Sequence, residues 1–166
     1  MNLSLGAVIV IIIIAILLFI SFYIISLYNK IVFSQNNTFK KFEPIDLAIK
    51  KYISIIKELK DIVNEPNMKE ELSILSDKLL KADDNNKKIL VLKDADYTIN
   101  RVFELCNNKK ISSLKEEYNK YNNKILYAEG IYNDKVKEYN NLLNEFPYNI
   151  VTKLLAIEEI NTIDGD

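Results

Sequence analysis

The chain begins with an unbroken apolar run and then changes to a periodic pattern. Residues 5–28 contain no charged side chain, and the first charged side chain is Lys30. About 20 apolar residues suffice to cross a bilayer core of about 30 Å, so the run predicts a transmembrane helix at 5–28 that contacts the lipid bilayer. A cleaved secretory signal is the competing interpretation, but no basic segment precedes the run and no small-residue cleavage motif follows it.

Beyond this run, apolar residues return every three or four positions, which is the spacing of one face of an α-helix. The pattern predicts helices over residues 45–63, 68–82, 92–106 and 111–145. These runs lack the period of two that is expected of strands. The fold class predicted is therefore all-α, with an N-terminal transmembrane helix followed by an antiparallel helical bundle of long helices.

Prolines and polar residues set the predicted limits of the helices. Pro66 stands where the second of these helices would begin, and Asn67 with Glu70 forms a predicted capping pair. Pro147 is expected to end the last long helix, because it has no backbone N–H and disfavours a helical residue before it. The segment after Pro147 predicts a short closing helix that folds back on the bundle through Ile150, Leu154 and Ile157.

These signals divide the chain into five predicted parts: a short tail at 1–4, the transmembrane helix at 5–28, a juxtamembrane helical stalk at 29–44, the helical bundle at 45–158 and a flexible tail at 159–166. The stalk is expected to continue the transmembrane helix, with Pro44 as a kink or a boundary. The tail is acidic and terminal, which favours disorder.

The distribution of lysines predicts the orientation in the membrane. The run has no basic residue before it, and lysines follow soon after it: Lys30, Lys40, Lys41, Lys50 and Lys51. Basic residues favour the cytoplasmic side, so we expect a single-pass protein of the cell membrane, with the N-terminus outside and the C-terminal domain in the cytoplasm. The alternative is an extracellular C-terminal domain. Tyr23 and Tyr28 would suit the membrane interface.

Composition excludes several function classes. The chain has no His, three Gly and one Cys, so it lacks the commonest metal ligand and any glycine-rich phosphate loop, and we expect no cofactor. Cys106 falls in an apolar helix phase and is predicted to be a buried thiol. The 22 basic and 23 acidic residues are interspersed, which argues against nucleic acid as a partner.

The stretch "AEGIYNDKVKEYNNLLNEFP" repeats a Tyr-Asn pair at an interval of seven residues. Tyr132 and Tyr139 occupy seam positions, so their rings are expected to pack while their hydroxyls find partners. Asn133 and Asn140 follow at the seam's edge, where an amide can bridge to a neighbouring helix and fix its register. A composition rich in Asn and Tyr, as from an A/T-rich coding sequence, is the alternative explanation.

The same stretch resembles the C-terminal signature of the LemA family, a Tyr-Asn-x-x-Val-x-x-Tyr-Asn pattern on a helix that ends in Phe-Pro. The matching residues are Tyr132, Asn133, Val136, Tyr139, Asn140, Phe146 and Pro147. Upstream, Tyr28, Asn29 and Asp46 are similar to the family's first soluble helix. The resemblance implies a membrane-anchored helical bundle and carries over no catalytic residue.

The leading functional hypothesis is a non-catalytic, membrane-tethered scaffold or interaction protein whose helical seams bind a protein partner or a second copy. One alternative is a membrane-surface sensor or lipid-remodelling protein that uses the lysines after the apolar run. A less favoured alternative is a metal-dependent hydrolase built from Asp46, Glu129 and Asp134, because such bundle sites normally include His.

Overall fold

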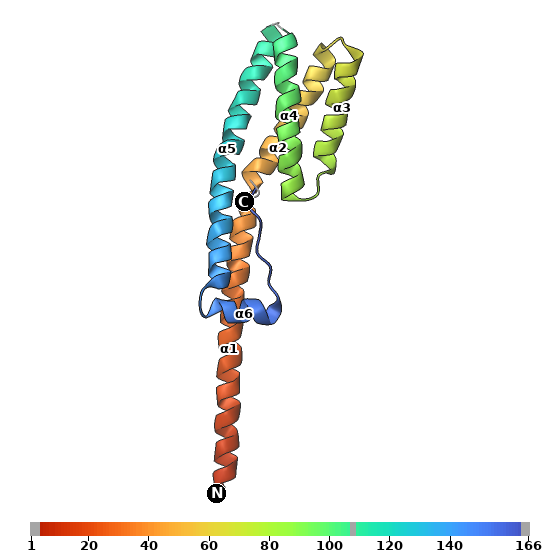
Figure 1. Cartoon of the computed structure of the whole chain (residues 1–166). Helices are drawn as coiled ribbons and strands as arrows, with labels where there is room; N and C mark the ends of the chain where they lie inside the picture. Colours follow the sequence, from red (N-terminus) through yellow and green to blue (C-terminus); the bar gives the residue numbers. More distant parts are fainter. Residues whose placement is uncertain (1–3, 107–108, 164–166) are drawn as a thin grey trace. The chain divides into compact units, whose positions relative to one another are not determined.

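The computed structural model describes residues 4–106 and 109–163, and all regular secondary structure in these ranges is helical. The helices in chain order are α1 (Leu5–Lys40), α2 (Glu43–Ile62), α3 (Pro66–Lys81), α4 (Asn85–Leu105), α5 (Lys109–Asn144) and α6 (Tyr148–Leu155) (Figure 1). This confirms the all-α prediction. The described residues form two compact units, which are taken in turn below: residues 4–38 with 135–160, and residues 39–134 with 161–163.

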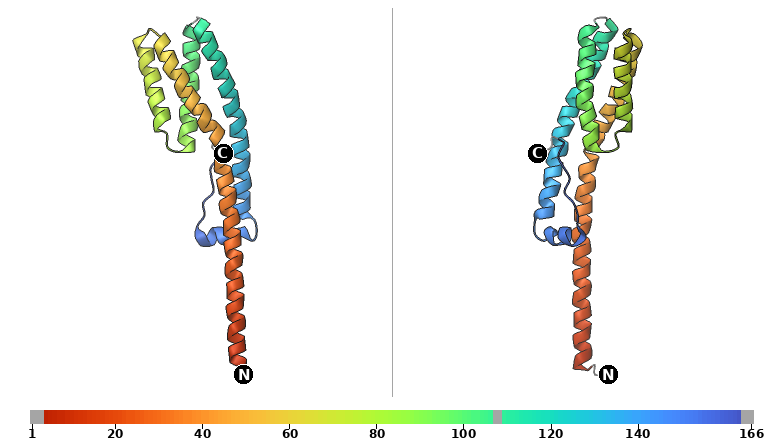
Figure 2. Two further views of the ribbon diagram at one scale, coloured as in Figure 1. Left: turned by 180° about the vertical axis from the view of Figure 1, so that it is seen from behind. Right: turned by 45° about the vertical axis from the view of Figure 1, so that its right-hand side comes forward.

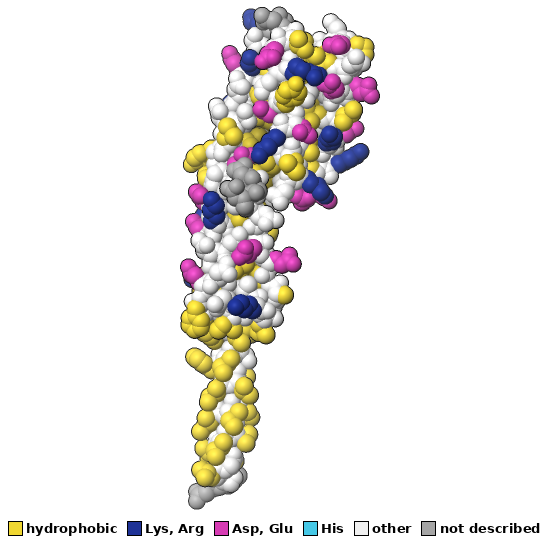
Figure 3. Space-filling view, in the orientation of Figure 1, with side chains coloured by type: hydrophobic (Ala, Val, Ile, Leu, Met, Phe, Trp, Pro, Cys, Tyr) yellow, Lys and Arg dark blue, Asp and Glu magenta, His cyan; other side chains and the backbone are white. Residues whose placement is uncertain are grey.

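Helix α1 carries the apolar run, and its large side chains from Leu5 to Tyr23 are exposed. Hydrophobic side chains cover this part of the helix in Figure 3. Among the described residues, one helical stretch, beginning at Leu5, is long and apolar enough to cross a membrane. Its most apolar window has a mean hydropathy of 3.4 and no buried residue. These properties are consistent with membrane anchoring.

The first unit is built from α1, the end of α5, and α6, which runs across α1 (Figure 2). Its core consists of Ile31, Tyr139, Leu143 and Val151, with partly buried neighbours that include Ile24 and Leu27. Near the end of α1, the Thr38 hydroxyl donates to the Lys135 carbonyl at 3.2 Å. The helix predicted to extend the apolar run therefore continues unbroken to Lys40 and is held by α5 and α6.

The second unit is a bundle of α2, α3, α4 and the first part of α5, with α2, α3 and α4 side by side (Figure 2). Residues spaced three and four apart on α2 and at its C-terminal cap are all buried, as their pattern predicts: Ile45, Ile49, Tyr52, Ile56, Leu59 and Val63. Helix α5 joins through Tyr118, whose ring stacks on Tyr52 with centroids 5.0 Å apart. It also meets Phe103 of α4 edge-on at 5.5 Å.

Some local predictions about helix ends are wrong. Helix α3 begins with Pro66 in its first turn, but no side chain caps it, so Asn67 and Glu70 do not form the expected capping pair. A side-chain cap occurs instead at α4, where Asp84 accepts from the Lys87 backbone N–H at 2.9 Å. Cys106 follows the last residue of α4 and is half-buried rather than buried. Pro44 lies in the first turn of α2 and marks a boundary.

The closing helix was predicted correctly, but two of the three residues expected to pack it against the bundle are exposed. Helix α6 exists, but Ile150 is 56% exposed and Leu154 is 67% exposed. Val151, one position after Ile150, is the residue that enters the core of the first unit. Ile157 packs against that core from the segment after the helix, as expected. An eight-residue helix with apolar side chains on both faces does not reveal from its sequence which face the protein covers.

Candidate functional site

The second Tyr-Asn pair holds the end of the chain in the first unit. Asn140 donates from its side-chain amide to the Ile160 carbonyl at 2.8 Å, and its side-chain oxygen accepts from the Ile160 N–H at 3.0 Å. Tyr139 is fully buried, and its hydroxyl donates to the Glu158 carbonyl at 3.4 Å. Burial raises the pKa of the Tyr139 phenol. One side-chain amide thereby satisfies both backbone groups of Ile160.

The first Tyr-Asn pair lies in the second unit and has a similar arrangement. The buried ring of Tyr132 meets Phe42 edge-on, with centroids 5.3 Å apart. Its hydroxyl accepts from the Asn85 amide at 3.5 Å. The Asn133 side-chain oxygen accepts from the backbone N–H of Ile163 at 2.9 Å. Both tyrosine rings are therefore buried within the chain and do not lie at an exposed interface.

The two asparagines bind the segment after α6 rather than a neighbouring helix, which corrects the expected role of their amides. In the first unit Asn140 bonds the backbone of Ile160, and in the second unit Asn133 bonds the backbone of Ile163. Both partners follow the last residue of α6 in the chain.

This binding also bears on the tail that was expected to be flexible at 159–166. Ile160 and Ile163 have backbone hydrogen bonds to α5, and Ile163 is buried, so residues 160–163 differ from that expectation. Residues 164–166 lie outside the described part of the chain.

The remaining signature residues have mixed surroundings. Val136 is fully buried, whereas Phe146 is 79% exposed. Pro147 is half-buried and follows a cis peptide bond. Upstream, Tyr28 and Asn29 are exposed on α1. Asp46 accepts from the Lys88 ammonium at 2.7 Å, so it joins α2 to α4 by an ion pair.

A partly buried polar cluster in the second unit was not predicted. The Tyr118 hydroxyl donates to the Asp96 carboxylate, which also accepts from the Asn122 amide at 3.4 Å. Burial, followed by the hydrogen bond to Asp96, raises the pKa of Tyr118. Burial likewise raises the pKa of Tyr52, whose hydroxyl has no hydrogen-bond partner among the described residues. The sequence signal for this cluster was an acid, Asp96, next to the apolar positions of α4, together with a tyrosine, Tyr118, at an apolar position of α5.

The acids of the metal hypothesis do not come together. Asp46 is paired with Lys88, Asp134 is exposed, and Glu129 is partly buried. Among the described residues, no three His, Cys, Asp or Glu side chains are grouped so that they could hold a metal ion.

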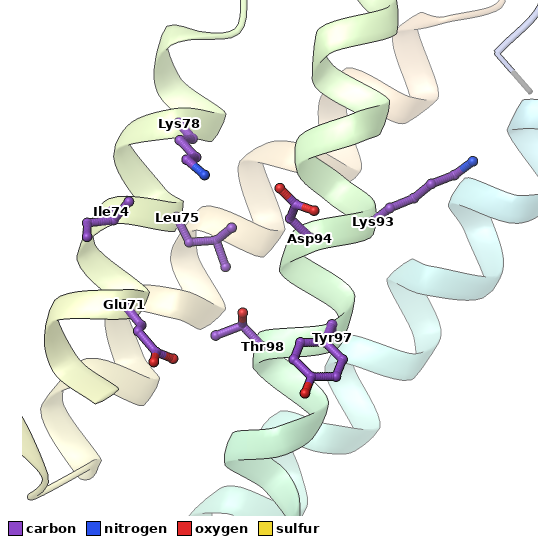
Figure 4. Close-up of a pocket in the computed structure, with 8 residues that line it drawn as sticks. All are labelled: Glu71, Ile74, Leu75, Lys78, Lys93, Asp94, Tyr97 and Thr98. Carbon is purple, nitrogen blue, oxygen red and sulfur yellow. The ribbon is translucent and has the colours of Figure 1, made fainter. Parts of the chain in front are cut away.

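A long trough runs between α3 and α4 and consists of two adjoining hollows of about 440 and 500 Å³. Its two sides have the same spacing of lining residues. They are Glu71, Ile74, Leu75, Asp77, Lys78 and Lys81 on α3 with Ala82 directly after it, and Lys87, Leu90, Val91, Lys93, Asp94, Tyr97 and Thr98 on α4. Figure 4 shows one hollow, with Leu75 and Thr98 between the two helices.

Large apolar side chains are exposed along this trough. Ile74 is 50% exposed, Leu90 64% and Tyr97 71%. Charges of both signs lie at the rim, and some are already paired, since Glu71 bonds Arg101 and Lys87 bonds Asp83 at 2.8 Å. An apolar floor with a charged rim is typical of a surface that binds another protein element.

The model of the LemA family matches residues 79–164, which is more than half of the chain. This range contains the whole Tyr-Asn signature and the α4 side of the trough, whereas Tyr28, Asn29 and Asp46 precede it. No curated protein matches the chain.

Proposed function

Because the chain belongs to the LemA family and begins with a long apolar helix, we propose that it is a membrane-anchored, non-catalytic interaction module. Helix α1 anchors it in the lipid bilayer, and the helical bundle presents a binding surface in the cytoplasm. The lysines that follow the apolar run, beginning with Lys30, support the cytoplasmic side.

The observation that carries the proposal is the trough between α3 and α4. From Glu71 to Lys81 its α3 side covers ten residue steps, which is about 15 Å or nearly three helical turns. Two packed helices with matching stripes form a groove into which a third helix can lay its apolar face. Ile74, Leu90 and Tyr97 are placed along that groove and are exposed without a partner helix.

The occupant we propose is an amphipathic helix of another protein. Its apolar side chains, spaced three and four apart, contact the floor of the trough. Its flanks carry charges of both signs, because Asp77 and Asp94 at the rim have the opposite sign to Lys78 and Lys81. None of these four forms an ion pair with another described residue, so they are available to a partner.

Site-specific photocrosslinking in native membranes tests this proposal. A photoreactive phenylalanine analogue replaces Tyr97 in the trough, and the matched control replaces Leu126, which is 60% exposed on α5 outside the trough. We expect a recurrent crosslink from position 97 that mass spectrometry maps to an amphipathic helix of one protein, and none from position 126. Equal crosslinking from both positions, or only a second copy of the chain, would overturn the proposal.

A tag after Asp166 tests the anchor and its orientation in the same preparation. We expect the protein to resist extraction by alkaline carbonate and the tag to be protected from protease in spheroplasts. Extraction by carbonate would contradict the anchor, and a cleaved tag would place the trough outside the cell.

A further inference from the structure

Helix α6 has an apolar face that the other described residues of the first unit leave uncovered. Val151 turns into the core, with 1% of its surface exposed. On another face, Ile150 and Leu154 are one helical turn apart and are 56% and 67% exposed. Phe146, in the turn before α6, is also exposed, at 79%. An apolar face of this kind on a soluble surface marks an interaction site.

The position of this face relative to α1 indicates what covers it. The large side chains of α1 are all exposed from Leu5 to Tyr23, and these nineteen helical residues span about 28 Å. This length is close to the hydrocarbon thickness of a bilayer, about 30 Å. Beyond Tyr23 one side of α1 is covered, because Ile24 and Leu27 pack against the core that holds Val151 while Ile25 and Tyr28 stay exposed. Helix α6 therefore meets α1 where α1 would leave the hydrocarbon.

The surface around this junction has the composition of a membrane interface. Figure 3 shows hydrophobic side chains gathered over α6, next to the apolar part of α1. The Lys30 ammonium lies 5.8 Å from the centre of the Tyr148 ring at the start of α6. Lys153 is exposed beside Leu154, and Tyr23 is exposed on α1. Aromatic rings and lysines beside an apolar face are favoured at the level of lipid headgroups.

We propose that α6 is an interfacial helix, and that α6 and the turn before it place Phe146, Ile150 and Leu154 in the headgroup boundary of the bilayer that α1 crosses. The proposal rests on the anchoring of α1, and it assigns the membrane surface as the binding partner of α6. In this arrangement α1 crosses the bilayer and α6 lies along its surface. This arrangement fixes the tilt of the first unit more firmly than a single helix does.

The absence of Trp from the chain allows a direct test with matched single substitutions. Three exposed phenylalanines of the first unit lie at different expected depths: Phe19 in the hydrocarbon, Phe146 at the boundary and Phe33 in water. Phe33 is ten residues beyond Tyr23 on α1, or about 15 Å. Each is replaced by Trp in the full chain, which is reconstituted in vesicles of phosphatidylcholine and phosphatidylglycerol with phosphatidylcholine brominated at defined depths.

We expect Phe19→Trp to be quenched most by deeply brominated lipid, Phe146→Trp by lipid brominated near the headgroup, and Phe33→Trp by neither. Leu154→Trp serves as a second probe of the same face and should behave like Phe146→Trp. If Phe19→Trp is quenched while both α6 probes match Phe33→Trp, the interfacial role of α6 is wrong and the anchor stands. Blue-shifted but unquenched α6 probes would mean a protein cover and would also overturn it. An unquenched Phe19→Trp would instead contradict the anchor itself.

Discussion

The two hydrogen bonds between Asn140 and Ile160 set the expected effect of replacing Asn140 with Ala. A typical intramolecular hydrogen bond contributes about 0.5–1.5 kcal/mol net, so the loss of both is worth about 1–3 kcal/mol. The C-terminal segment can detach while the helices remain folded, so the loss should appear as local opening. At 1.4 kcal/mol for each tenfold change, opening at Ile160 should increase about 5-fold to 150-fold.

Amide hydrogen exchange of the full chain in detergent micelles measures this opening. We expect the Ile160 amide to exchange faster in Asn140→Ala by the factor above, while the amides in the middle of α5 keep their protection. Asn141→Ala is the matched control, because Asn141 is exposed on the next position of α5 and the gain in helix propensity is the same. Asn140→Asp should not rescue, since its oxygen would face the Ile160 carbonyl where the amide now donates.

The reasoning would be refuted by an unchanged Ile160 exchange rate in Asn140→Ala, or by an equal change in Asn141→Ala. Either result would mean that the side-chain amide does not hold the segment and that apolar packing alone does so.

Three further predictions concern the buried tyrosines. Tyr118→Phe removes the donor to Asp96 and should lower the free energy of unfolding by about 1–3 kcal/mol in urea titrations. Tyr52→Phe should lower it little, because the Tyr52 hydroxyl has no described hydrogen-bond partner. Equal losses in the two variants would contradict a stabilising hydrogen bond between Tyr118 and Asp96. The pKa of Tyr118 is raised in the folded state, so the contribution of this phenol to stability is complete below the ordinary pKa near 10 and falls as the pH rises above it. Urea titrations across this pH range should therefore show a smaller loss of unfolding free energy at alkaline pH for Tyr118→Phe than for the parent protein. Parallel curves for the two proteins would count against the raised pKa. Replacing Tyr132 or Tyr139 with Ala should each cost about 3–5 kcal/mol, and an unchanged melting midpoint would show that the ring is not in the core.

The fold could be predicted from the sequence because helical periodicity records which residues face the core. The α2 seam from Ile45 to Val63 and the α5 positions Tyr132, Val136 and Tyr139 are buried as their spacing indicates. The buried face of a helix can be predicted without knowing its partner helix, because any apolar partner would cover the same apolar face.

The partners of polar groups could not be predicted in the same way. Asn140 at the edge of a seam was compatible with a neighbouring helix or an extended segment, and only the packed chain shows that Ile160 fills this place. The Asp96–Tyr118 hydrogen bond likewise depends on how α4 and α5 are rotated against each other. Hydrogen bonds depend on distances of tenths of an ångström, which residue spacing does not determine.

The exposed surfaces escaped prediction for a related reason. Periodicity assigns an apolar face to the interior, but Ile150 and Leu154 are exposed on α6, and Leu90 and Tyr97 are exposed on α4. In each case the helix has apolar residues on two faces and the rest of its unit covers one of them. If the second apolar face binds a lipid surface or a helix of another protein, the sequence of this chain does not contain that partner, so periodicity alone cannot tell this face from a buried one.

The measurement that tests the proposed function most directly is the Tyr97 crosslink in native membranes, repeated in chains that also carry Ile74→Asp in the trough or Leu126→Asp outside it. Both changes place a carboxylate at an exposed apolar position, so they differ in location and not in chemistry. If the trough binds a partner helix, Ile74→Asp should abolish the crosslink and Leu126→Asp should leave it intact. A crosslink that survives Ile74→Asp, or is lost equally in both, would contradict an interaction module that works through α3 and α4.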